Sequence, residues 1–115
     1  MKHFDWGIIP QEQLNDKLSR KFISSEKITI AQLFLYKGCL VPEHSHESEQ
    51  ICMVINGCLK FHVEGQVQLV KANQMLQIPS NFRHFAEALE DTLVYDIFSP
   101  VRQDWVDGDD SYLRK

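Results

Sequence analysis

The chain has 115 residues, enough for one domain with a hydrophobic core and too few for a second domain of ordinary size. Its composition, 43% hydrophobic and 24% charged, is that of an ordinary globular protein. The formal charge of −4 is spread along the chain without a basic cluster, so we expect neither nucleic acid nor an anionic membrane as a partner.

The cysteines indicate the redox environment in which the protein works. Cys39, Cys52 and Cys58 are an odd and sparse set, which argues against a disulfide framework. Cys52 and Cys58 lie in apolar runs, where we expect them to be buried as small free hydrophobic residues. No apolar stretch approaches the ~20 residues of a membrane span, and the first residues lack the apolar region of a signal peptide. We therefore expect a cytoplasmic protein.

Taken from the N-terminus, the sequence contains many short strand patterns and few helical ones. After an N-terminal strand segment, residues 1–27, a run rich in β-branched and aromatic residues predicts a strand over 28–36. Further strand patterns lie over residues 50–55, 58–63, 66–70, 75–78 and 92–98. This spacing indicates one all-β domain, a sandwich or barrel, with its core over about 28–100. The C-terminal arm, 101–115, is expected to be exposed or to form a short helix.

Two turns separate the strands in the middle of the chain. Asn56-Gly57 accepts positive φ at both central positions and predicts a type I′ hairpin between the strands on either side. Glu64-Gly65 predicts a second reversal before the strand over 66–70.

The strand over 50–55 is apolar on both faces. Gln50, Cys52 and Val54 share one face, while the other face carries Ile51, Met53 and Ile55. A strand with two apolar faces must be covered twice, by its own core and by another sheet or subunit. We therefore predict a homodimer that covers the outward face of this strand.

A pair of histidines is the first sign of a metal site. His44 and His46 are two residues apart, so on an extended chain both imidazoles point the same way. Imidazole is a common ligand for Zn, Cu, Fe and Ni. A His-x-His pair alone is weak evidence, because acidic neighbours also fit a polar surface loop. A preceding Gly38, a following Gln50 and a distant His84 favour the metal site.

These residues resemble the two signature motifs of the cupin superfamily. The first motif, G-x5-H-x-H-x3-E-x6-G, is matched by Gly38, His44, His46 and Gly57, with Gln50 in the glutamate position. The second motif, G-x5-P-x-G-x2-H-x3-N, is matched by Pro79 and His84, with Asn73 and Asn81 in the glycine positions and Ala88 in the asparagine position. Asparagine tolerates a left-handed backbone better than other non-glycine residues, so the turns survive.

The resemblance covers about residues 28–100 and implies a cupin double-stranded β-helix, a jelly-roll-like barrel. It further implies one divalent metal ion (Ni, Mn, Zn or Fe), bound by His44, His46, Gln50 and His84. Glu49 is the alternative fourth ligand, but it is expected on the opposite strand face from Gln50. Three imidazoles and an amide leave the +2 charge of the ion uncompensated, which favours Lewis acidity and disfavours oxidation to a trivalent ion.

The last strand carries a further candidate group. Asp96 stands among apolar neighbours, either as a structural carboxylate paired with Arg102 or Arg83 or as a site group with a raised pKa. The pattern alone favours the ion pair. The stretch also resembles the final strand of small cupins that linearise 4,5-unsaturated uronates in pectin degradation. That resemblance implies that Asp96 moves protons, Arg102 binds a substrate carboxylate and Phe98 shapes the pocket.

The leading hypothesis is a metal-dependent enzyme of lyase or isomerase type that acts on a small sugar acid, with ring opening of 4,5-unsaturated uronates as the specific reaction. A non-catalytic metal-binding or sugar-binding module is the alternative, and an iron-dependent dioxygenase is a third. Asp96 distinguishes the first two, because an enzyme needs it unpaired and facing the pocket.

Overall fold

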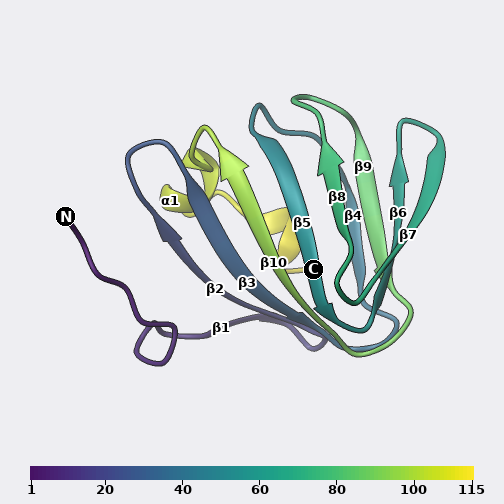
Figure 1. The fold of residues 1–115 in the computed structure, drawn as a ribbon, viewed down its shortest axis with the longest axis horizontal. Helices are drawn as coiled ribbons and strands as arrows, with labels where there is room; N and C mark the ends of the chain where they lie inside the picture. The colour runs from purple at the N-terminus through teal and green to yellow at the C-terminus, as the bar shows by residue number, and fades with distance from the viewer.

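The structure, a computed structural model, describes all 115 residues and is built from β-strands (Figure 1). Its two helices are single turns, α1 (Gln103–Val106) and the 3-10 helix η1 (Ser111–Leu113). The strands are β1 (Glu12–Asn15), β2 (Leu18–Ser24), β3 (Thr29–Leu35), β4 (Leu40–His44), β5 (Glu49–Asn56), β6 (Cys58–Val63), β7 (Gln66–Lys71), β8 (Met75–Ile78), β9 (His84–Ala88) and β10 (Thr92–Ser99). The all-β class predicted from the sequence is confirmed.

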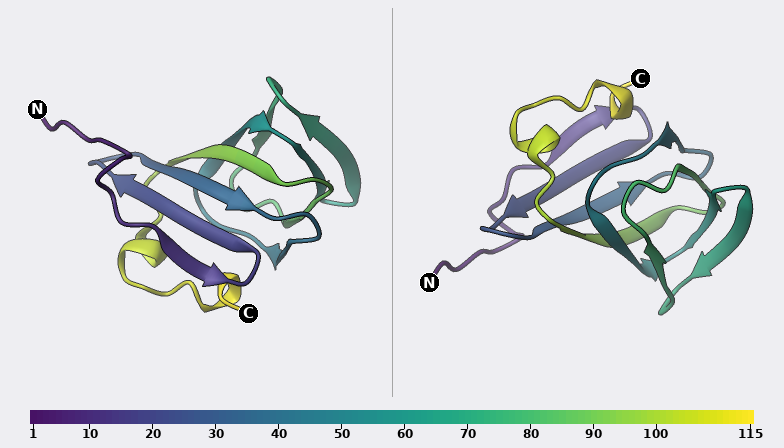
Figure 2. Two further views of the ribbon diagram at one scale, coloured as in Figure 1. Left: turned by 90° about the horizontal axis from the view of Figure 1, so that it is seen from below. Right: turned by 90° about the horizontal axis from the view of Figure 1, so that it is seen from above.

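The strands form two antiparallel sheets that curve around a common interior (Figure 2). The six-stranded sheet has the order β1-β2-β3-β10-β5-β8, and the four-stranded sheet has the order β4-β9-β6-β7. After β3 the chain crosses repeatedly from one sheet to the other. This alternation is that of the jelly-roll-like barrel expected from the sequence.

Strand alternation brings polar side chains into the apolar interior. Every second residue of β10 is buried, and the same holds for most of β5. The register pairs Phe98 with Gln50 and Asp96 with Cys52. Gln50 and Asp96 therefore share the interior face of neighbouring strands.

The chain does not form the hairpin predicted at Asn56-Gly57. Because β5 and β6 belong to different sheets, these residues form a corner where the chain leaves one sheet for the other. Gly57 has a φ of +97°, and a Cβ atom there would lie 2.5 Å from the carbonyl oxygen of Asp91, which only glycine avoids. The two-residue hairpin is at Glu64-Gly65, where both residues have positive φ between the paired strands β6 and β7.

Both ends of the chain contribute more than the sequence indicates. The N-terminal segment supplies β1 and β2, which extend the six-stranded sheet beyond the expected core. Of the two expectations for the C-terminal arm, the short helix is present as α1. The exposed arm is wrong, because Trp105, Asp110 and Leu113 are buried and the arm lies against the N-terminal strands (Figure 2). Its anchor is Arg20 on β2, which is 1% exposed and donates from Nη2 to Asp110 Oδ2 at 2.6 Å.

The expectations for the cysteines are confirmed. All three are free, and all three are buried. Neither helix has the length and apolar character that crossing a membrane would require.

Candidate metal centre

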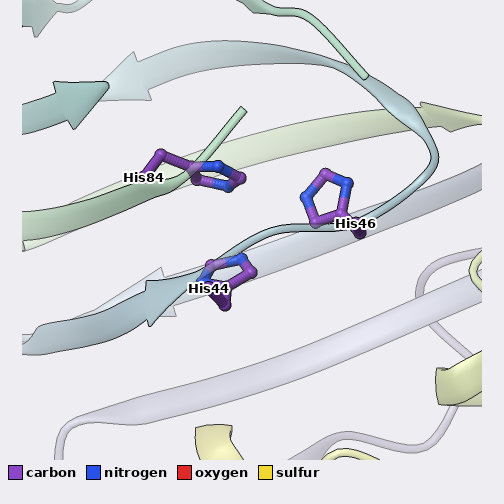
Figure 3. Close-up of side chains that lie close together, drawn as sticks. All are labelled: His44, His46 and His84. Carbon is purple, nitrogen blue, oxygen red and sulfur yellow. The ribbon is translucent and has the colours of Figure 1, made fainter. Parts of the chain in front are cut away.

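Three histidines converge on one point inside the barrel (Figure 3). His44 ends β4, His46 lies two residues further along in the following loop, and His84 begins β9, opposite His44 in the four-stranded sheet. One ring nitrogen from each lies within 4.8 Å of the other two. The fold thus brings the neighbouring pair and the distant third histidine together, and these residues could hold a metal ion.

The ring orientations fix which nitrogen is free. The Nδ1 atoms of His44, His46 and His84 lie 2.8 Å from the carbonyl oxygens of Pro42, Ser48 and Phe82, respectively. A carbonyl oxygen only accepts, so each Nδ1 donates the proton and each Nε2 keeps its lone pair. The buried Nε2 of His84 has no hydrogen-bond partner. Three unprotonated nitrogens facing one point fit a divalent cation, and the carbonyl contacts orient the rings as in other histidine metal sites.

Burial keeps the three rings neutral. It lowers the pKa of His44 to about 3 and that of His46 to about 4, and it also lowers the pKa of His84. The positive charge of Arg102 lowers all three pKa values further. At neutral pH the imidazoles are therefore in the unprotonated form that metal binding requires.

Gln50 approaches the histidines from the other sheet. It is buried on β5, and its Oε1 lies 3.1 Å from Nε2 of His46. Because that nitrogen is unprotonated, both atoms are acceptors, and a cation between them would satisfy both. Glu49 is exposed instead and accepts a hydrogen bond from Gln77 at 2.8 Å. Of the two candidate fourth ligands, only Gln50 faces the histidines.

Asp96 lies beside this cluster without an ion-pair partner. It is 6% exposed, and its Oδ1 has no hydrogen-bond partner. Burial raises its pKa to about 6, although Cys52, Gln50 and Arg102 act in the opposite direction. The ion pair that the pattern favoured is wrong, because Arg102 pairs with Asp104 and Arg83 lies 3.5 Å from Glu43.

Arg102 is held in place by several side-chain contacts. Its Nε and Nη2 donate to the two carboxylate oxygens of Asp104 at 3.1 and 2.9 Å. Its guanidinium lies over the rings of Phe98 and Trp105, 4.8 and 4.4 Å from their centroids. The Phe98 ring in turn packs edge-on against His46. The predicted pocket residues Phe98 and Arg102 are thus neighbours of the histidine cluster.

An interior cavity of about 60 Å³ joins these groups. Twelve of its 17 lining residues are hydrophobic, and the polar minority includes His44, His84, Gln50, Asp96 and Arg102. Apolar walls around a few convergent polar groups are typical of a small-molecule site.

Sequence reasoning missed three lining residues, Trp105, Tyr112 and Leu113, because they belong to the supposed arm. The signal that could have found them is the presence of large apolar side chains within an acidic tail.

Comparisons with known proteins agree with this fold. Residues 34–98 match the family model described as "Cupin domain". The structure of KdgF from Halomonas sp. is similar with a TM-score of 0.84 and 26% identity, over 91% of this chain and 98% of that one. An RmlC-like cupin from Shewanella frigidimarina has the same TM-score at 23% identity, over 91% and 96% of the two chains. Oxalate decarboxylase from Bacillus subtilis shares the fold at a TM-score of 0.78 and 15% identity, over 84% of this chain and 29% of that one. No curated protein matches the chain.

Proposed function

Because the chain belongs to the cupin family, we propose that it is a metal-dependent enzyme that opens the ring of a 4,5-unsaturated uronate to a linear keto acid. The observation that carries this proposal is Asp96, a buried carboxylate on the cavity wall with no ion-pair partner. A binding module has no need of such a group. A proton-transferring enzyme does need one.

The proposed metal ligands are His44, His46, Gln50 and His84. When bound, a divalent ion supplies Lewis-acid polarisation of a substrate oxygen. All four donors are neutral in their binding forms, so the ion keeps its full charge and attracts an anionic ligand. The same neutral set disfavours a trivalent ion, which counts against the dioxygenase alternative.

Asp96 is the proposed base and acid. Ring opening of the cyclic enol ether is an isomerisation, so it needs no further reactant. The carboxylate takes the proton from the hydroxyl on the anomeric carbon, the bond from that carbon to the ring oxygen breaks, and an aldehyde and an enolate form. The protonated Asp96 then returns the proton to carbon 4, and the former ring oxygen becomes the keto oxygen. A pKa of about 6 suits both steps, because the group is ionised at neutral pH and still yields its proton readily.

Arg102 and the aromatic wall position the substrate. The guanidinium is the cationic side chain nearest the site and is proposed to bind the substrate carboxylate. Phe98 and Trp105 pack edge-on against each other and both contact the guanidinium, which fixes its position at the cavity. The similarity to KdgF and the free cysteines support a sugar-acid enzyme of a reducing cytoplasm.

The test is the loss of the conjugated chromophore of unsaturated galacturonate or its epimer. Protein loaded separately with Ni, Mn, Zn and Fe(II) is mixed with the substrate, and a His44→Ala/His46→Ala double variant serves as the control. We expect decay well above the enzyme-free rate with at least one metal and none above it in the double variant. Decay no faster than the enzyme-free control with all four metals would leave the binding module as the better hypothesis.

A further inference from the structure

Tyr112 lies in the site although it belongs to the C-terminal arm. It lines the cavity, and its ring centroid is 4.9 Å from that of His44. The segment around it is fixed to the N-terminal strands, because Asp110 pairs with the buried Arg20 and the carbonyl oxygen of Leu113 accepts from Asn15 at 3.0 Å. The position of Tyr112 is therefore part of the fold.

The Tyr112 hydroxyl has a hydrogen to spare. Its oxygen lies 2.7 Å from Nη2 of Arg102 and 3.3 Å from Nε1 of Trp105. Both of these nitrogens can only donate, so the phenolic oxygen accepts from both. The phenolic hydrogen is used in neither contact, and the hydroxyl makes no other hydrogen bond in the structure.

Arg102 also has a hydrogen-bond donor that is not used. Its Nε and Nη2 donate to Asp104 and Tyr112, which leaves Nη1 without a partner. A guanidinium nitrogen and a phenolic O–H, both from residues that line the cavity, thus lack an acceptor. Unpaired hydrogen-bond donors on a cationic side chain and on its neighbour suit a ligand with anionic oxygen atoms.

We infer that Tyr112 is a substrate-binding residue whose hydroxyl donates to the same carboxylate that Arg102 binds, and that it selects sugar acids over neutral sugars. Among anions, a carboxylate fits better than a phosphate, because Arg102 already shares its charge with Asp104 and a doubly charged group would be repelled more strongly by that carboxylate. The inference rests on the proposed function only in that it takes a sugar acid as the ligand of the cavity.

Binding of saturated ligands tests the inference without any turnover. D-galacturonate lacks the enol ether and cannot react, and D-galactose differs from it by the missing carboxylate. In calorimetric titrations of the purified protein, Tyr112→Phe keeps the ring and loses the donor. We expect its affinity for galacturonate to fall ~10- to 100-fold, the loss of one hydrogen bond to a charged group, with its affinity for galactose unchanged. Tyr36→Phe is the matched control and should bind as the parent does, because Tyr36 is 49% exposed and outside the cavity.

A spectroscopic measurement reports on the Tyr112 phenol itself. The chain has three tyrosines, so protein labelled with ¹³C at the phenol carbon gives three signals, and Tyr112→Phe assigns one of them. Galacturonate should move the Tyr112 signal, and galactose should not. The inference is overturned if Tyr112→Phe binds galacturonate as tightly as the parent, if the signal stays in place, or if the parent does not bind galacturonate. Galacturonate binding through Tyr112 without ring opening would instead remove the proposed function and leave this inference standing.

Discussion

Replacing Asp96 by asparagine keeps the size of the side chain and removes its charge. We expect Asp96→Asn to lose most of the ring-opening rate, about 10²- to 10⁴-fold for a positioned acid–base group, while metal stays bound. The same change should make the metal-free protein more stable at neutral pH. A group that serves catalysis at the expense of stability gives this combination, whereas an ordinary structural carboxylate does not.

The expected gain in the stability of Asp96→Asn follows from the burial of Asp96. Burial raises its pKa from 3.8 to about 6, so keeping it ionised at neutral pH costs the folded state about 3 kcal/mol. Between these two pH values the Asp96 side chain of the folded state holds a proton that the unfolded state has lost, so the contribution of Asp96 to the stability of the parent falls as the pH rises through this window. The variant has no such loss. Its advantage should therefore be near zero below pH 3.8 and reach about 3 kcal/mol above pH 6.

Urea unfolding of both proteins with chelator present, at pH values below and above this window, measures the difference. Asp16→Asn, at an exposed turn outside the cavity, is the matched control and should show none of the stability gain expected of Asp96→Asn. A variant less stable than the parent at neutral pH, or a difference that does not depend on pH, would refute the reasoning. Asp96 would then be a satisfied structural group, and the proposed mechanism would lose its base.

Three further predictions concern the metal, acid and assembly. Protein loaded with metal and freed of affinity-tag histidines should hold about one divalent ion per chain by elemental analysis, and the His44→Ala/His46→Ala variant none. Equal, near-zero metal in both would contradict the site. Without metal, the free energy of unfolding should fall as the pH drops below 6.5, because the unfolded chain binds protons at His44 and His46, whose folded pKa values are about 3 and 4. This fall, measured by urea unfolding across the pH range, should be smaller in the double variant. An equal fall in parent and variant would contradict the assigned role of the two histidines. Light scattering should return the mass of a homodimer, in which we expect the partner to cover Ile51, Met53 and Ile55. A 13.4 kDa particle would rule out the dimer.

Local patterns predicted the parts of the site that depend on local geometry. The spacing of His44 and His46 and the alternation of β5 are properties of an extended chain, and the structure follows them. Asn73 and Asn81 adopt positive φ of 70° and 66°, as expected of asparagine in a glycine position.

Contacts between distant segments could not be predicted in the same way. Asp110 anchors the arm on a strand that lies 90 residues earlier in the chain. The failed hairpin at Asn56-Gly57 has the same cause, because its two strands pair with distant partners rather than with each other. The sequence offered Arg102 more than one acidic partner. In the folded arm Arg102 pairs with Asp104, and Asp96 is left without an ion pair.

The register of β5 and β10 limits how this chain can change length during evolution. Phe98 faces Gln50 across the two strands, and Asp96 lies two residues before Phe98 on the same interior face. Inserting one residue between Phe98 and Asp96 would turn Asp96 out of the barrel, because side chains alternate with a period of two. The turn between β6 and β7 is under a different constraint, because Glu64 is hydrogen-bonded to Arg83, the residue before His84. Relatives that keep this site should therefore hold a constant number of residues through the inner half of β10.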